Sequence, residues 1–417
     1  MGAPAADDSA GMRRIAPDFL AARRVDRLLA ELIFDVAVEA NALAAEGQTV
    51  YPFHMGELNF PTPPNIVEAC AKALYDGKTK YTPNGGLPEL RDALAADVGR
   101  DRGVYYQAEN VAIQPAGKPV IGKFLLALMD PGDEVLYPNP GFPIYSSLIG
   151  FFGGVAVPYT YVEGADGFHL DLEGLERLVT AKTRLLILND MHNPTGAEGS
   201  PAELERLAQF VLEHNLYVLC DEAYFAVRYS GVSRSLVSQP GMKERSVILY
   251  TFGKKYAMTG FRLGAAIGPK RIIDIIVRLN VNWEACCNHF AQYGALEALT
   301  GADGGTLRML EALKERRDAA VEILNATAGV HCLTPSTTFF LYPNVTGAVE
   351  RCGCSDHETF RRLLLSRTGV SFCTRPHFGE PSAGETECYL RISYSGITIA
   401  QIEEGLGKFR DFIADPW

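Results

Sequence analysis

Residues 183–196 read TRLLILNDMHNPTG, a short apolar run that ends abruptly in polar residues and a Pro-Thr-Gly turn. The same change recurs in LYVLCDEAY at 216–224 and in SVILYTFGKK at 246–255. Continuous apolar runs of this length, separated by segments with helical periodicity, predict strands of a parallel sheet that is covered by helices on both faces. We therefore place the chain among the α/β proteins.

The alternation extends on both sides of this stretch, from about residue 65 to residue 280. Further strands are predicted in NVAIQPAG, DEVLYP and GGVAVPY. Residues 270–330 have helical periodicity, and the chain ends in a helical pattern, ITIAQIEEGLGKFRDFI. We predict a three-layer αβα large domain with a mostly parallel sheet, together with a smaller α+β domain.

The two ends of the chain are expected to join the smaller domain, because no long linker separates them from the middle. Apolar residues at three-to-four spacing over 18–45 predict one amphipathic helix that ends near Gly47. The predicted division is a disordered segment at 1–15, an N-terminal helix and arm at 16–60, a large domain at 61–300 and a small C-terminal domain at 301–417.

Composition and charge exclude several classes of partner. The 417 residues include 39 Lys and Arg against 50 Asp and Glu, a formal net charge of −11. Nucleic-acid binders usually carry a basic face, so we expect no nucleic-acid partner. No apolar stretch reaches the length of about 18 to 20 residues that spans a bilayer. The N-terminus lacks the basic start and apolar middle of a signal peptide, and we expect a cytoplasmic protein without membrane contact.

The nine cysteines are scattered and odd in number, which is typical of reduced thiols in a large cytosolic protein. There is no Cys-x-x-Cys pair. Cys352, Cys354 and His357 in RCGCSDH are spaced closely enough to suggest a metal site, but no second cluster accompanies them. We interpret them as loop residues and predict no metal.

One motif imitates a nucleotide-binding loop. Residues 117–123, GKPVIGK, fit the first seven positions of a P-loop, but Phe124 stands where Ser or Thr must hold magnesium. A glycine-containing turn that opens a helix still offers backbone N–H groups and a helix dipole to a phosphate. The segment therefore predicts a phosphate site without a nucleoside triphosphate.

Polar residues follow four of the predicted strands directly. In an open parallel sheet, ligands bind beyond the carboxyl ends of the strands, so these residues are expected to lie close together. Taken singly, each has a structural explanation as a turn, a helix cap or a surface charge. Together they supply a carboxylate, an amide, a phenol and an amine, and they are Lys118 after the first strand, Asn189 to Gly196, Asp221 to Tyr224, and Thr251 to Lys255.

At this point the chain resembles the fold-type I pyridoxal-phosphate enzymes, and more narrowly the class I/II aminotransferases of the aspartate aminotransferase superfamily. The strongest segment is GKKYAMTGFRLG at 253–264, which is similar to the family's Schiff-base lysine followed by Met-Thr-Gly-aromatic-Arg. Counting back four residues from Met258 selects Lys254 over Lys255. Supporting segments, in order along the chain, are FHMGELNFPTP, KYTPNGGLPELRDAL, AGKPVIGKFLLALMDPGDEV, NPGFPIY, HNPTG, DEAY and YLRISYSG.

The resemblance implies pyridoxal 5′-phosphate as cofactor, bound mainly by the large domain, and a role for each matching residue. Lys254 would hold the cofactor as an aldimine and move the proton during catalysis. Asp221 would keep the pyridine nitrogen protonated, and Asn193 and Tyr224 would contact the phenolic oxygen. The remaining implied contacts are ring stacking by Phe142, phosphate binding by Gly117, the Lys118 backbone, Thr251 and Arg262, and a further cofactor contact by Ala116. Arg391 would bind the substrate's carboxylate with backbone near Gly56, and Asn193 would also contact the substrate. Tyr81 matches a residue that reaches a neighbouring subunit's phosphate, which implies a homodimer with shared active sites.

The segments expected to surround the substrate depart from the family pattern. Gly253 stands where Ser is common before the lysine, and the stretch before AQYGALEAL is bulky and polar. Substrate loops vary more than scaffolds, so drift explains this as well as function does. Our hypothesis is that a pocket for a larger or unusually polar amino acid is built by Trp283, Glu284, His289, Arg375 and His377.

These features predict a pyridoxal-phosphate-dependent aminotransferase that moves an amino group from an L-amino acid to a 2-oxo acid. The alternative is a specialised biosynthetic enzyme with the same cofactor that catalyses elimination, replacement, carbon–carbon bond formation or cyclisation. Fold and cofactor residues do not separate the two, because each reaction uses the same electron sink. A regulatory protein without catalysis is disfavoured, since it would not need both Lys254 and Arg391.

Overall fold

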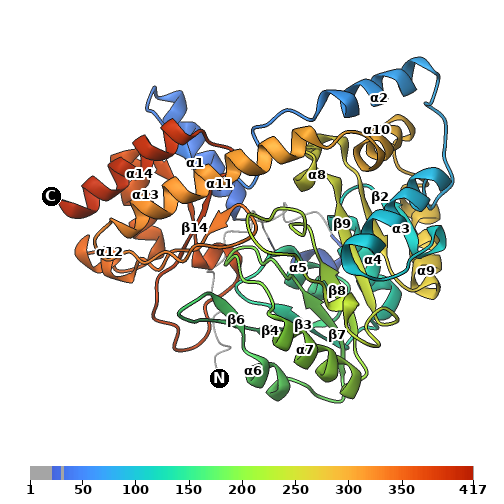
Figure 1. The fold of residues 1–417 in the computed structure, drawn as a ribbon. Helices are drawn as coiled ribbons and strands as arrows, with labels where there is room; N and C mark the ends of the chain where they lie inside the picture. Colours follow the sequence, from blue (N-terminus) through green and yellow to red (C-terminus); the bar gives the residue numbers. More distant parts are fainter. Residues whose placement is uncertain (1–20, 30–31, 417) are drawn as a thin grey trace.

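A computed structural model describes residues 21–29 and 32–416, and its centre is a seven-stranded sheet (Figure 1). The strand order is β2-β10-β9-β8-β7-β3-β4, and every neighbouring pair is parallel except the two that involve β10. The predicted mostly parallel sheet is therefore confirmed. Its strands are β2 (Val111–Gln114), β3 (Glu134–Pro138), β4 (Val155–Tyr159), β7 (Thr183–Leu188), β8 (Tyr217–Asp221), β9 (Ser246–Thr251) and β10 (Gly264–Ile267).

Helices cover both faces of this sheet, as the uninterrupted apolar strands require. Along β7, Leu186 and Leu188 pack into one core, and Leu185 and Ile187 pack into the core on the opposite face. The first core includes α3 (Pro88–Arg102), α7 (Pro201–Glu213) and α10 (His289–Thr300); the second includes α4 (Lys118–Leu128), α5 (Ile144–Phe151) and α9 (Lys270–Trp283). The same half of the fold contains α2 (Pro64–Tyr75), α6 (Leu172–Arg177), α8 (Phe252–Lys255) and the hairpin β5 (Tyr161–Glu163) and β6 (Phe168–Leu170).

A separate hydrophobic core combines residues from both ends of the chain. Tyr51 and Phe53 pack there with side chains from the region 309–413. Figure 1 shows α11 to α14 gathered with α1 on the left of the view, away from the large sheet. The elements are α1 (Ile33–Ala45), β1 (Tyr51–Pro52), α11 (Gly304–Asn325), β11 (Phe340–Leu341), α12 (Thr346–Arg351), α13 (His357–Thr368), β12 (Val370–Ser371), β13 (Cys373–Thr374), β14 (Leu390–Ser393) and α14 (Ile399–Ala414). This mixture is the smaller α+β part of the predicted fold.

The prediction of a single helix over residues 18–45 is wrong for the part of this range that the structure describes. A 3-10 helix spans Arg23–Arg27, Leu28 is extended, and α1 begins only at Ile33. The backbone N–H of Leu29 donates to Ser147 Oγ at 3.0 Å, so contact with α5 overrides the helical pattern locally. Residues 1–20, which include the segment predicted to be disordered, lie outside the described residues.

The sequence analysis also missed β10, the one antiparallel member of the sheet. Its four residues, GAAI, are all buried, and their small side chains gave no strand signal beside the preceding motif. A Cβ on Gly264 would lie 2.8 Å from the carbonyl carbon of Ala116, so this strand must approach the turn after β2 closely. In the described part of the chain, none of the helices has the length and hydropathy needed to cross a membrane.

Candidate active site

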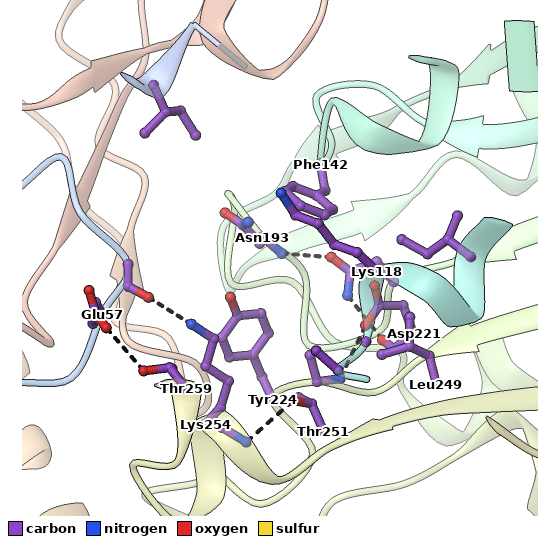
Figure 2. A pocket seen from close by; sticks show the side chains of 18 of the residues that line it. Glu57, Lys118, Phe142, Asn193, Asp221, Tyr224, Leu249, Thr251, Lys254 and Thr259 are labelled. Atoms are coloured by element: carbon purple, nitrogen blue, oxygen red, sulfur yellow. Dashed lines mark hydrogen bonds between the residues drawn. The ribbon is translucent and has the colours of Figure 1, made fainter. Parts of the chain in front are cut away.

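A cavity of about 470 Å³ opens at the carboxyl ends of β2, β8 and β9 and is bounded on the other side by the start of α1 and by β14 (Figure 2). Parallel strands end at one edge of a sheet, which brings together side chains that are distant in sequence. All of the predicted site residues except Tyr81 line this cavity, namely Gly56, Ala116, Gly117, Lys118, Phe142, Asn193, Asp221, Tyr224, Thr251, Lys254, Arg262 and Arg391.

The amine of Lys254 projects into the cavity from α8, the short helix that follows β9. Its Nζ donates to the carbonyl oxygen of Gly56 at 2.8 Å and lies 5.5 Å from the ring centroid of Phe339. Burial lowers the pKa of Lys254 to about 8, and the nearby guanidinium groups of Arg391 and Arg262 act in the same direction. About a tenth of this amine is therefore neutral, and nucleophilic, at pH 7.

The adjacent lysine points elsewhere. Lys255 Nζ lies 3.8 Å from a carboxylate oxygen of Asp97 and 4.9 Å from the ring centroid of Tyr256. Of the two lysines in the motif, Lys254 is the one with its amine in the cavity.

Asp221, the last residue of β8, places a buried carboxylate in the cavity. Tyr145 Oη donates to its Oδ2 at 2.6 Å, and the N–H of Ala223 donates to its Oδ1 at 3.2 Å. Burial raises the pKa of Asp221 to about 6, although both hydrogen bonds oppose the shift. Both of these donors are neutral, so the carboxylate can accept a further hydrogen bond from a cationic N–H group of a ligand.

The turn that follows β7 places the side-chain amide of Asn189 beside Asp221. Asn189 Nδ2 donates to the carbonyl oxygen of Asp221 at 3.0 Å, and Asn189 Oδ1 accepts from the N–H of Asn193 at 3.0 Å. Tyr224 lies opposite, with its ring packed edge-on against Phe339 and Phe340. The amide of Asn193 and the phenol of Tyr224 thus both line the cavity.

One end of the cavity suits an anion. Helix α4 begins there at Lys118, directly after Gly117, and no side chain caps its N-terminus. A Cβ on Gly117 would lie 2.9 Å from Leu249 Cδ2, so a larger residue here would require the Leu249 side chain to move. Thr251 and Arg262 line the same cavity, and Arg262 Nη1 donates to the carbonyl oxygen of Thr259 at 2.9 Å. These groups fit a phosphate.

Arg391 provides a second anion-binding group, on β14. The residue is 3% exposed, and its guanidinium lies between the rings of Phe340 and Phe378, at 4.6 and 4.9 Å from their centroids. Nη2 donates to the carbonyl oxygen of His54, and Nη1 lies 3.4 Å from Asn193 Oδ1. The buried Nε has no hydrogen-bond partner. A buried cation that lines a cavity fits a ligand carboxylate.

Tyr81 lies outside this cavity. Its side chain is 88% exposed, on the loop that precedes α3. A contact between Tyr81 and a neighbouring subunit's phosphate therefore stays a prediction.

The five residues proposed to build a substrate pocket do not line the cavity of this chain, so their role in substrate binding stays a prediction. Glu284 forms an ion pair with Lys123, Arg375 pairs with Glu385, and His377 shares a hydrogen bond with Thr374 Oγ1. Trp283 is 54% exposed, and His289 Nδ1 lies 3.1 Å from the carbonyl oxygen of Lys80. Local partners hold these side chains away from the pocket, which no sequence pattern revealed.

Several lining residues were missed. Tyr145 lies three residues after Phe142 in NPGFPIY, at the start of α5, and that closeness in sequence was a usable signal. Ile33, Phe34 and Phe340 come from elements whose position depends on the tertiary fold. In the described ranges, no three His, Cys, Asp or Glu side chains are grouped as they would be around a metal ion.

The donor set as a whole fits pyridoxal phosphate. An anion cradle at a helix N-terminus suits the phosphate, a buried acceptor suits a protonated ring nitrogen, and a partly neutral lysine amine suits the aldehyde. Phe142 lines the same cavity and offers a ring face for stacking.

Comparisons with known proteins agree with this geometry. The family described as "Aminotransferase class I and II" matches residues 48–409. The chain is 33% identical to a probable aspartate/prephenate aminotransferase of Aquifex aeolicus, over 93% of this chain and 97% of that protein. It is 30% identical to an aspartate aminotransferase of Bacillus subtilis, over 94% and 98% of the two chains.

Solved structures show the same fold. The aspartate aminotransferase of Rhizobium meliloti superposes with a TM-score of 0.88 at 28% identity, covering 95% of this chain and 99% of that one. The aspartate aminotransferase of Thermus thermophilus with maleate gives a TM-score of 0.86 at 30% identity, covering 94% and 99%. The chain therefore belongs to the class I and II aminotransferases, the pyridoxal-phosphate-dependent enzymes that transfer amino groups between amino acids and 2-oxo acids.

Proposed function

We propose that this enzyme binds pyridoxal 5′-phosphate in the cavity around Lys254 and transfers the amino group of an acidic L-amino acid of the aspartate type to a 2-oxo acid. The main support for this proposal is that Lys254 and Arg391 line one cavity, with the buried carboxylate of Asp221 at the sheet edge of that cavity. That set supplies a nucleophile, a carboxylate anchor and a partner for a heterocyclic nitrogen.

The cofactor would be held along the strand ends. The backbone N–H groups of Gly117 and Lys118 at the N-terminus of α4, the Thr251 hydroxyl and Arg262 would bind the phosphate, next to the backbone of Ala116. Phe142 would stack on one ring face, Asn193 and Tyr224 would donate to the phenolic oxygen, and Asp221 would hold a proton on the ring nitrogen.

When bound, the cofactor supplies an aldehyde for amine exchange and a ring that stabilises negative charge at the substrate Cα. Arg391 would fix the α-carboxylate through its planar guanidinium group, which orients the Cα–H bond. The amine of Lys254, released when substrate enters, would remove the proton from the substrate Cα. It would then deliver that proton to the cofactor carbon that receives the amino group. Asp221 would keep its charge next to a cation throughout these steps, which lowers the cost of its burial.

Lys118 is the residue that we propose for recognition of a second carboxylate. Its side chain lines the same cavity as Arg391, and its ammonium lies 5.4 Å from the ring centroid of Phe142. A substrate with two carboxylates requires two cationic groups besides those that bind the phosphate. The similar proteins are named for aspartate, and maleate, the ligand named with the Thermus structure, is a dicarboxylate.

We also propose a cytoplasmic homodimer in which Tyr81 contacts the partner's phosphate. Large apolar side chains lie exposed around the loop that carries Tyr81, including Tyr75 at 93% and Trp283 at 54% exposure. A surface of this kind favours a protein interface. The nine unpaired cysteines suit a reducing compartment.

The separate core of the C-terminal region supports a division into a large domain at 61–300 and a small one at 301–417 joined by the arm at 16–60, with the cavity between them.

The test is a half-reaction with the purified protein loaded with cofactor. Each amino acid of a panel is added alone, and the cofactor spectrum, keto acid and ammonia are measured. Stoichiometric keto acid with no ammonia, fastest with aspartate or glutamate, is the expected result. Ammonia release would instead favour elimination, the alternative chemistry. A neutral or basic amino acid as the best donor would overturn the assignment of substrate class.

A further inference from the structure

A lysine with no role in the proposed function is buried behind the phosphate-binding end of the cavity. Lys123, in the second turn of α4, has no solvent exposure. Its Nζ donates to Gln114 Oε1 and to Asn280 Oδ1, both at 2.7 Å, and forms an ion pair with Glu284. Three acceptors thus satisfy the three donors of one buried ammonium group.

Each acceptor belongs to a different part of the site's surroundings. Gln114 is the last residue of β2 and leads directly into the turn at 115–117, which opens α4. Asn280 lies near the end of α9 and donates through Nδ2 to the carbonyl oxygen of Asn84 at 2.7 Å. Glu284 begins the loop between α9 and α10. One ammonium group therefore connects the phosphate turn to two loops.

The loop between α2 and α3, which carries Tyr81, binds the loop between α9 and α10. Asn84 Nδ2 donates to the carbonyl oxygen of Ala285 at 2.7 Å, and the N–H of Thr82 lies 3.4 Å from the sulfur of Cys286. Tyr81 is adjacent to Thr82. The backbone of the loop beside Tyr81 is thus held relative to α4 by contacts that converge on Lys123 and Glu284.

Stability alone is a poor explanation for this arrangement. Removing an ammonium from water is costly, and burial lowers the pKa of Lys123 accordingly. Buried ion pairs are often no more stabilising than apolar residues of the same volume, whereas fixing one arrangement of several elements is their best-attested use. A fully satisfied polar network of this kind also disfavours alternative packing of its members.

We propose that Lys123, with Glu284, is a positioning residue for the phosphate site: it holds the turn at 115–117 and the loop that carries Tyr81 in one fixed relation. The inference rests on the proposed function, because it assumes that a phosphate binds at this turn. Lys123 does not touch the cofactor and acts through Gln114, Asn280 and Glu284.

The experiment compares Lys123→Met and Glu284→Gln with the wild-type holoenzyme. Glu284→Gln preserves shape and an acceptor, so it remains informative where Lys123→Met fails to fold. The dissociation constant is measured by cofactor absorbance for pyridoxal phosphate and for pyridoxal, which lacks the phosphate. Residues that support a ligand-binding shell change affinity by about 10- to 100-fold in metal sites, and we expect a loss of about tenfold for pyridoxal phosphate. The affinity for pyridoxal is expected to stay within about twofold of wild type.

Glu198→Gln is the matched control, because Glu198 also pairs with a more buried cation, Arg228, and neither residue lines the cavity. It is expected to change neither dissociation constant. Equal losses for both ligands would mean general disruption and would overturn the inference. Unchanged affinity for pyridoxal phosphate in a folded Lys123→Met variant would overturn it too. Failure of the wild type to bind pyridoxal phosphate at all would instead refute the proposed function.

A coupling measurement tests the link to Tyr81. In the wild-type background, Tyr81→Phe should weaken pyridoxal phosphate binding. In the Glu284→Gln background the same change should cost less, since the loop is already displaced. Strict additivity of the two losses would show that Glu284 does not position Tyr81.

Discussion

Tyr145, on α5, donates a 2.6 Å hydrogen bond to Asp221 Oδ2, and both residues line the same cavity. Tyr145 has no solvent exposure, so this hydrogen bond is made in a region of low dielectric, where hydrogen bonds to a charged group are strong. It stabilises the carboxylate form that the proposed mechanism needs. Burial pulls the pKa of Asp221 upward, and Tyr145 opposes it.

Replacing Tyr145 by Phe should therefore raise the pKa of Asp221 above its value of about 6 and narrow the range of active pH. Loss of a hydrogen bond to a charged group, about 1.5 to 3 kcal/mol, raises the pKa by about one to two, so the charged fraction at pH 7, and kcat with it, should fall by about 2- to 15-fold. The acid limb of the kcat profile should move to higher pH. Steady-state kinetics from pH 5 to pH 9 give both values.

Tyr159→Phe provides the control, since Tyr159 Oη donates to the carbonyl oxygen of Ile187 at 2.9 Å and its side chain does not line the cavity. Tyr159→Phe should lower the stability of the fold and leave the pH dependence of kcat unchanged. A profile that shifts equally in both variants would mean that Tyr145 acts through packing.

The carboxylate of Asp221 also makes the cofactor-free protein less stable. Its pKa rises from 3.8 to about 6 on folding, so between these values the folded chain binds more protons than the unfolded chain. Stability of the cofactor-free protein should thus fall as pH rises from about 4 to about 6, by an amount of about 3 kcal/mol above pH 6. Asp221→Asn should remove that loss, raise the melting temperature at pH 7 and lower activity by about 10²-fold or more. Calorimetry of both cofactor-free proteins checks it, and a lower melting temperature for the variant would contradict it.

The sequence was sufficient for the parts of the site that depend on strand ends. Asp221, Asn193 and Lys254 each follow an apolar strand, and a parallel sheet brings such positions together whatever the loops do. Gly117 was predictable because its turn opens a helix. Arg391 and Gly56 came only from the resemblance, since the small α+β part shows no strong periodicity.

What could not be predicted depends on tertiary contacts. Glu284 looked like a substrate-binding residue, but its partner Lys123 lies 161 positions earlier in the chain. The break at Leu28 reflects contact with Ser147, and β10 is a strand because its small residues fit between β2 and β9. None of these effects has a local sequence signal.

Lys254→Ala should abolish the visible absorbance of the lysine-bound cofactor and reduce activity by about 10²- to 10⁴-fold or more. Lys255→Ala, whose amine faces Asp97, should retain both. Because the pKa of Lys254 is about 8 rather than 10.5, the rate at which the cofactor-free protein captures pyridoxal phosphate should rise with pH and reach half its maximum near pH 8. Stopped-flow absorbance from pH 6 to pH 10.5 measures this. A midpoint near 10 would show that burial does not depress this pKa.

Substitutions of Arg391 and Lys118 should show that each residue binds a different carboxylate of the substrate. Arg391→Lys loses the planar fork and one of two parallel hydrogen bonds, so kcat/KM should fall by about 10- to 100-fold for every amino acid. Lys118→Ala should lower kcat/KM by a similar factor for aspartate and glutamate, and leave alanine nearly unchanged, because alanine has no second carboxylate. The contrast excludes a simple loss of cofactor, which would lower all three alike. Half-reaction rates at saturating cofactor measure it, and an equal loss for alanine and aspartate would assign Lys118 to the phosphate alone.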